Sequence, residues 1–181
     1  ADSIPAGASV LFSENNVPAP RTITVKVFNA GTMAAGDYAV VVKALSGSKS
    51  EMIEFKLRVF ALTPEITTLI EPENFVANQI LKPLFRWVPL KEALIYSFQL
   101  STDPAFGTVL YKDSLIPNNS CLFKGGFALQ YGTKYYWRVR GVNSCGKGDY
   151  SSVFEFTTRN PVGIAENRSV AENVNLYPNP V

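Results

Sequence analysis

The residues that most often carry catalytic chemistry are scarce in this chain. Among its 181 residues there are two cysteines, Cys121 and Cys145, and no histidine. Without histidine, a Ser-His-Asp triad, a Cys-His dyad and nearly every zinc, copper or haem site lack the group that moves protons or binds metal near neutral pH. We therefore expect no catalytic residue, no metal site and no cofactor in these residues.

The carboxylates do not replace the missing histidine, because they are dispersed along the sequence. Glu71 and Glu73 are two residues apart beside a proline, and the sequence does not place any carboxylate pair at the separation that a glycosidase needs. Asp103 and Asp149 are candidates for a calcium site built from loop oxygens. The D-x-D-x-D-G pattern of a calcium-binding loop is missing around both.

The two cysteines have a structural interpretation. Cys121 opens an expected strand at 120–123, and Cys145 follows an expected strand at 133–143. If these strands are antiparallel neighbours, the start of one and the end of the other lie at the same end of the molecule. A disulfide is favoured, with two free thiols as the alternative. A nucleophilic cysteine would have no histidine to activate it.

The strand at 133–143 also carries the best candidate for a ligand surface. Successive side chains of a strand point in opposite directions, so Trp137 and its alternate neighbours face inward, whereas Tyr136, Arg138 and Arg140 face outward. Trp87 and Trp137 are predicted as core anchors rather than as a platform for sugar stacking. The outward set could bind a ligand, or it could cover neighbouring strands and form cross-strand pairs.

These residues must be positioned by strands, because short runs of alternating apolar and polar residues fill the sequence and no 3.6-residue period occurs. The prediction is an all-β fold of antiparallel β-sandwiches. Residues 1–62 form one module with few strands for a sandwich, and residues 63–160 form a second domain. The linker between them is at 61–65 and contains Pro64, and residues 161–181 begin as a polar linker. In the second domain we expect seven strands, at 66–70, 84–88, 94–101, 108–112, 120–123, 133–143 and 152–158.

Charge and hydropathy exclude two classes of partner. Seventeen Lys and Arg residues against 15 Asp and Glu residues give a net charge of +2, which is too small and too scattered for sequence-independent binding of nucleic acid. The longest apolar stretches, such as 39–42 and 94–96, are far shorter than the roughly 20 residues that span a bilayer. We expect no nucleic-acid partner and no transmembrane segment.

The sequence Leu129-Gln130-Tyr131-Gly132-Thr133-Lys134-Tyr135-Tyr136-Trp137-Arg138-Val139-Arg140 resembles a loop and the following strand of fibronectin type III domains. The resemblance covers residues 64–158. It implies a tyrosine corner at Tyr135, whose hydroxyl returns to a nearby backbone group. It also implies core positions for Phe85 and Trp87 in Phe85-Arg86-Trp87, and for Phe98 in the strand that crosses to the opposite sheet.

Other segments resemble exported proteins of Bacteroidetes-type bacteria. The runs at 101–106 and 143–146 are similar to the fibronectin variant of those proteins, and residues 1–62 are similar to an immunoglobulin-like module that is often next to a reprolysin-like metallopeptidase. In such relatives this module has further strands ahead of Pro5-Ala6-Gly7. The end of the chain resembles the opening of a type IX secretion sorting domain, at Leu176, Tyr177, Pro178, Asn179 and Pro180.

The resemblance implies a non-catalytic accessory or spacer region of a larger secreted or cell-surface bacterial protein, with a metallopeptidase as the expected upstream part. Its expected partners are the type IX secretion machinery and the upstream domains of the same polypeptide. The HExxH zinc motif is not in these residues, so no enzyme activity is assigned to them. The alternative is an adhesin-like module that binds carbohydrate or a protein through sandwich loops.

Overall fold

A computed structural model describes residues 6–14, 18 and 22–161 of the chain. Over these residues it consists of strands, turns and one short 3-10 helix, Ala30–Thr32. The predicted all-β fold class is confirmed. In the described ranges we find no helix with the length and apolar character that a bilayer crossing requires.

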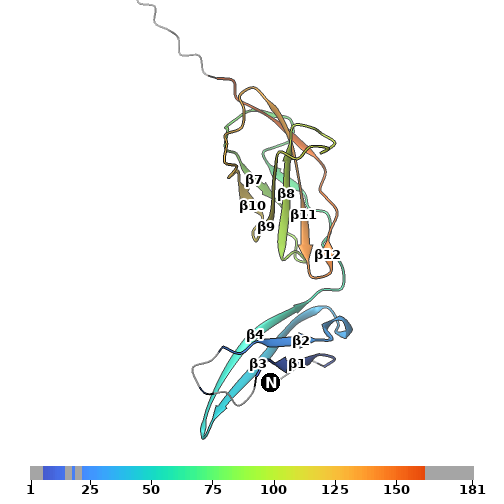
Figure 1. The fold of residues 1–181 in the computed structure, drawn as a ribbon. Helices are drawn as coiled ribbons and strands as arrows, with labels where there is room; N and C mark the ends of the chain where they lie inside the picture. The colour runs from blue at the N-terminus through green and yellow to red at the C-terminus, as the bar shows by residue number, and fades with distance from the viewer. Residues whose placement is uncertain (1–5, 15–17, 19–21, 162–181) are drawn as a thin grey trace, which may run out of the picture.

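The first part of the chain consists of two hairpins, each a separate two-stranded sheet (Figure 1). Strand β1 (Ser9–Phe12) pairs with β2 (Val25–Phe28), and β3 (Gly36–Ser46) pairs with β4 (Lys49–Val59), both antiparallel. The longer hairpin turns at Gly47, whose φ of 61° lies in the left-handed region that glycine adopts without strain. The predicted period of two is seen over residues 55–59 of β4, where partly buried and exposed side chains alternate.

These hairpins bury few large side chains. Val40 is fully buried and Met33 and Phe60 are nearly so, but Leu45, Met52 and Ile53 each leave more than 60% of their surface exposed. A hairpin without a covering layer is marginally stable in water, because its apolar face remains solvated. Within the described residues this part therefore has a much smaller core than the part that follows.

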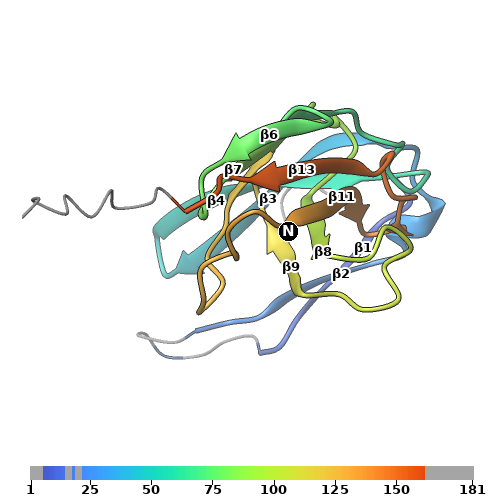
Figure 2. The same ribbon diagram turned by 90° about the horizontal axis from the view of Figure 1, so that it is seen from above.

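The second part is a β-sandwich of two sheets (Figures 1 and 2). One sheet has three strands in the order β10-β7-β5, and the other has the order β6-β13-β11-β8-β9, with β12 paired to β11. The strands are β5 (Leu69–Glu71), β6 (Val76–Gln79), β7 (Leu84–Trp87), β8 (Ile95–Ser101), β9 (Tyr111–Ile116), β10 (Ser120–Leu122), β11 (Lys134–Asn143), β12 (Gly146–Lys147) and β13 (Phe154–Thr158).

Several strands differ from their sequence-based expectation. Strand β5 begins at Leu69 rather than at residue 66, and β12 lies outside the seven expected strands. Strand β6, which pairs in parallel with β13, was not predicted, because its residues do not alternate between buried and exposed. Strand β9 begins at Tyr111 rather than at Thr108. The Thr108 carbonyl accepts a hydrogen bond from the Ser101 hydroxyl at 2.6 Å, so this residue belongs to the turn between β8 and β9.

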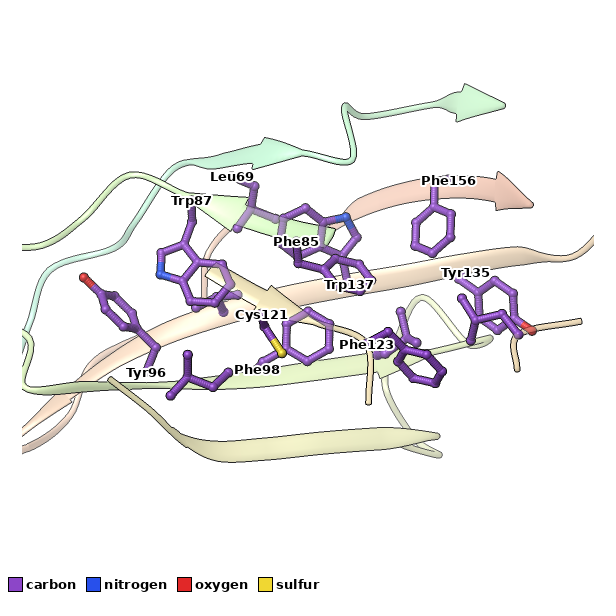
Figure 3. Close-up of a cluster of buried hydrophobic side chains, with 14 residues drawn as sticks. Leu69, Phe85, Trp87, Tyr96, Phe98, Cys121, Phe123, Tyr135, Trp137 and Phe156 are labelled. Carbon is purple, nitrogen blue, oxygen red and sulfur yellow. The ribbon is translucent and has the colours of Figure 1, made fainter. Parts of the chain in front are cut away.

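The space between the two sheets is filled by aromatic side chains (Figure 3). Phe85 of β7 packs on Phe98 of β8 and on Trp137 of β11, with ring centroids 4.6 and 5.0 Å apart. Trp87 packs edge-on against Tyr96 at 5.3 Å. Phe85, Trp87, Phe98 and Trp137 have no exposed surface. This core fixes the inward face of β11 and, because side chains alternate, also fixes which residues face out.

The linker between the two parts is held against the sandwich by specific contacts. The Asn143 side-chain amide donates hydrogen bonds to the Leu62 carbonyl at 2.8 Å and to the Glu92 carbonyl at 3.0 Å. Pro64 lies so close to Gly148 that a Cβ on this glycine would be 2.2 Å from the Pro64 carbonyl oxygen. The end of β11 and the residue after β12 therefore hold the linker through hydrogen bonds and close packing.

Candidate functional site

The outward face of β11 carries the residues that the sequence singles out as a ligand surface. In the register with β8, Arg138 lies opposite Gln99 and Arg140 lies opposite Ser97. Tyr136 lies opposite Ser101 on one side and Glu155 of β13 on the other. Strand β11 is thus an interior strand with partners on both sides, and its outward side chains lie in the middle of the sheet face.

Two aromatic rings hold the Arg138 guanidinium. The Arg138 Cζ atom lies 4.0 Å from the centre of the Phe106 ring and 4.1 Å from the centre of the Tyr150 ring. Both rings are therefore in contact with this one guanidinium. Arg140 lies 4.3 Å from the same Tyr150 ring. These ring–guanidinium contacts join Phe106, Arg138, Tyr150 and Arg140 in one cluster, which we call the arginine stack.

The turn after β8 is built to present Phe106 to this stack. Phe106 has a φ of 58°, a left-handed conformation that is strained for a bulky residue. The Asp103 carboxylate fixes the turn by accepting hydrogen bonds from the Ala105 amide at 2.9 Å and the Gly107 amide at 2.7 Å. These two backbone donors lower the pKa of Asp103, because they favour its charged form.

The two arginines have no acidic partner among the residues that the structure describes, since none of the ion pairs there includes them. Arg138 Nε donates to the Gln99 Oε1 atom at 2.9 Å. Arg140 Nε and the Tyr150 hydroxyl are buried atoms without a hydrogen-bond partner in the same residues. Lys112 of β9 lies opposite Gln99 and adds a third cation to this face. The arrangement offers planar N–H donors and uncompensated positive charge to an anion.

Sequence reasoning identified the two arginines but missed both rings. Phe106 is in a turn and Tyr150 is in the segment before β13, so neither follows the strand period that revealed Arg138 and Arg140. The Asp-Pro-Ala-Phe-Gly run at 103–107 is the one pattern that could have pointed to a rigid turn there. Tyr136, which was grouped with the arginines, is outside the arginine stack.

Tyr135 makes the contact that the resemblance implies for it. Its hydroxyl accepts a hydrogen bond from the Gln130 amide at 2.9 Å, and its ring stacks on Phe156 with centroids 5.6 Å apart. Leu129, six residues before it, is also buried. This contact ties the loop before β11 to the core.

The predicted disulfide between Cys121 and Cys145 is contradicted, because both thiols are free. Cys121 lies opposite Phe85 in the three-stranded sheet, and its side chain is among the aromatic residues of the core (Figure 3). Cys145 is in the exposed turn between β11 and β12, in the other sheet, where its Sγ atom donates to the Phe60 carbonyl at 3.2 Å. The strands that carry the two residues follow each other in sequence but belong to different sheets.

Their environments give the two thiols different reactivities. Burial raises the pKa of Cys121 to about 11, so this thiol is protonated as well as inaccessible at pH 8. We expect one equivalent of thiol to react with a disulfide reagent in the native protein and two equivalents in denaturant. Cys145→Ser should abolish the native reaction and leave one thiol in denaturant. If unreduced protein showed no thiol in denaturant and a mass two hydrogens lower, the free thiols would be refuted.

The same burial predicts a pH dependence of stability. Because the thiol pKa is higher in the folded state than its ordinary value of 9.0, the unfolded state loses this proton first as pH rises. The Cys121 contribution to stability is therefore complete below pH 9 and is lost between pH 9 and about 11. The difference in free energy of unfolding between the protein and Cys121→Val, measured in urea from pH 8 to 11, should shift in favour of the variant. A constant difference would contradict a buried neutral thiol.

The other predicted sites have simpler outcomes. Leu176, Tyr177, Pro178, Asn179 and Pro180 lie outside the described residues. In the part of the chain that the structure describes, no group of three or more Cys, Asp and Glu side chains is placed to hold a metal ion. The Asp103 carboxylate is occupied by backbone amides.

Comparison with known proteins gives similarity in fold alone. No protein-family model matches the chain, and no curated protein matches it. Among solved structures, it is similar to a human fibronectin type III domain, of fibronectin type III domain containing protein 3, at 22% identity with a TM-score of 0.43, covering 59% of this chain and 96% of that one. It is also similar to an Fn3-like protein from Clostridium thermocellum at 18% identity (TM-score 0.37, 55% and 93% covered) and to the FN5 domain of Drosophila Lar at 20% (TM-score 0.38, 54% and 98% covered).

Proposed function

We propose that these residues are a non-catalytic spacer region of a larger exported bacterial protein, in which the β-units hold an upstream part at a set distance and orientation. The observation that carries this proposal is the set of contacts that hold the linker against the sandwich. Asn143 binds the Leu62 carbonyl, the Cys145 thiol binds the Phe60 carbonyl, and Pro64 packs on Gly148. A linker fixed by three contacts holds the two β-units in one relative orientation, whereas a flexible Gly/Ser linker would not.

The export part of the proposal depends on the sequence. The resemblance of residues 176–180 to a type IX sorting signal, after a polar linker, supports recognition by that secretion machinery and a location outside the cell or on its surface. The resemblance of residues 1–62 to modules beside reprolysin-like metallopeptidases supports a peptidase as the upstream part. An HExxH motif in the upstream part of the parent gene is the expected finding.

The spacer role is tested by measuring distances across the linker. Spin labels at Glu54→Cys and Lys124→Cys, both exposed positions, are placed in a Cys145→Ser background that keeps a hydroxyl donor toward the Phe60 carbonyl. We expect one narrow distance distribution by pulsed electron resonance. Asn143→Ala should broaden it, and Ser144→Ala, an exposed neighbour, should not. A distribution that is already broad before Asn143 is changed would refute a stiff spacer.

The sorting role needs a separate experiment. A reporter fused to residues 161–181, with any parent sequence that follows them, should leave the cell in a host that has the type IX system. The same fusion with Tyr177→Ala and Pro178→Ala should remain in the periplasm. Retention of the unchanged fusion in that host would refute the sorting signal and leave the spacer role intact.

A further inference from the structure

We propose that Arg138 and Arg140 form a binding site for the sulfate or carboxylate groups of an anionic polysaccharide. This inference does not depend on the spacer role or on export. It comes from the arginine stack, in which two guanidinium groups contact the Tyr150 ring and one of them also contacts the Phe106 ring.

The first step is that the guanidinium groups are already ordered. Stacking at 4.0 to 4.3 Å, together with the hydrogen bond from Arg138 Nε to Gln99 at 2.9 Å, fixes side chains that would otherwise lose rotamer freedom on binding. Arg138 Nε is engaged by Gln99 and Arg140 Nε is buried, so the donors left for a ligand are the terminal Nη groups, and a guanidinium presents these as two parallel N–H donors to a planar oxyanion.

The second step is that nothing in the described residues neutralises these charges. Two acidic groups on neighbouring segments are otherwise engaged: Glu155, opposite Tyr136, is paired with Lys134 at 2.6 Å, and Asp103, in the turn of Phe106, accepts two backbone amides. Asp149, beside Tyr150, is exposed, and it forms no ion pair among those residues. Lys112 extends the positive charge across β8 to β9. Arginines on a sheet face ordinarily pair with carboxylates across the strands, but here the opposite residues are Gln99 and Ser97.

The third step concerns the structure of the turn. Phe106 adopts a strained backbone conformation, and four hydrogen bonds around Ser101 and Asp103 hold it there. Strain that the surrounding structure over-determines marks a position whose side chain is needed. The Phe106 side chain is buried and its ring lies 4.0 Å from Arg138 Cζ, so this conformation places it in the arginine stack.

The last step selects a polysaccharide over a peptide. Extended peptides commonly bind sandwiches by adding a strand to a free sheet edge, but β11 pairs with both β8 and β13 and has no free edge here. Recognition is then by side chains alone. Arg138 and Arg140 are two residues apart on β11, a spacing of about 7 Å along a strand, so a polymer with repeated anionic groups can engage both, while one small oxyanion engages one.

The test is titration of the full chain with four probes: dextran sulfate, polygalacturonate, uncharged dextran and polyglutamate. We expect one or both anionic polysaccharides to bind, with shifts of the Arg138 and Arg140 Nε resonances by NMR, and no binding of dextran. Dextran sulfate and polygalacturonate separate sulfate from carboxylate recognition. Arg138→Gln with Arg140→Gln should weaken binding at least tenfold for each arginine lost.

The control removes the same charge elsewhere. Arg86→Gln with Arg159→Gln, at exposed positions away from the arginine stack, should change affinity by less than threefold. Arg138→Lys with Arg140→Lys keeps the charge, and should still lose affinity because a lysine does not present a planar pair of donors. Thermal melting confirms that each variant is folded. Three results would each overturn the proposal: an equal loss of affinity in the control, full binding by the lysine variant, or tighter binding of polyglutamate than of either polysaccharide.

Discussion

Replacing Trp137 with alanine should lower the free energy of unfolding of the sandwich by about 3 to 5 kcal/mol, the usual cost of removing a buried tryptophan. Trp137 is fully buried on β11 and packs on Phe85 at 5.0 Å, Phe98 at 6.1 Å and Phe154 at 6.0 Å, so its loss opens a cavity bordered by both sheets. Urea unfolding followed by circular dichroism measures the change.

Two matched variants show whether packing is the cause. Trp137→Phe should lose less than the alanine variant. The indole N–H has no partner within the described residues, so the phenylalanine variant loses side-chain volume but no hydrogen bond. Tyr131→Ala removes an aromatic ring that is 46% exposed and should change stability by less than about 0.5 kcal/mol. A Trp137→Ala loss as small as that of Tyr131→Ala would contradict the aromatic core.

Tyr135→Phe should cost about 1 to 2 kcal/mol, although it removes one oxygen atom. The hydroxyl of Tyr135 accepts the Gln130 amide at 2.9 Å, and without it this partly buried N–H loses its partner, which is more costly than the net value of the hydrogen bond. The ring remains on Phe156, so packing is unchanged. Equilibrium unfolding gives the loss, and hydrogen exchange should show faster exchange of the Gln130 amide.

The neighbouring residue provides the control for this prediction. Tyr136→Phe makes the same chemical change one position along β11, on the outward face of the strand. Its expected cost is near zero. Equal costs at the two positions, or an unchanged exchange rate at Gln130, would show that the hydroxyl of Tyr135 does not anchor the loop.

The sequence-based strands were most reliable where alternation was strong. The run from Tyr135 to Gly141 predicted both the inward aromatic face and the outward arginines of β11, because a strand side chain has two directions available and burial selects one. The parallel strand β6 was missed for the complementary reason. Val76 is the one residue of β6 that packs against the core, and backbone pairing to β13 holds the rest, so no alternation of side chains along the strand predicts it.

The prediction of a disulfide was wrong because of the strand order. Cys121 and Cys145 are on or beside strands that are adjacent in sequence, and the prediction treated those strands as neighbours in one sheet. In a sandwich, consecutive strands often cross to the opposite sheet, as β10 and β11 do here. One thiol then points into the core and the other lies in an exposed turn. Strand order was the missing information, and alternation within a strand does not contain it.

What the sequence determined by itself is thus local and periodic: the all-β class, most strand positions, the faces of β11 and the burial of Trp87 and Trp137. The tertiary structure alone decided what lies across from each face. It brought Phe106 and Tyr150, which are 44 residues apart in the sequence, to the same guanidinium. It also separated the two thiols and placed the linker against the end of β11. Such contacts arise from chain segments distant in sequence, whose meeting depends on strand order, register and loop closure rather than on any pattern within a segment.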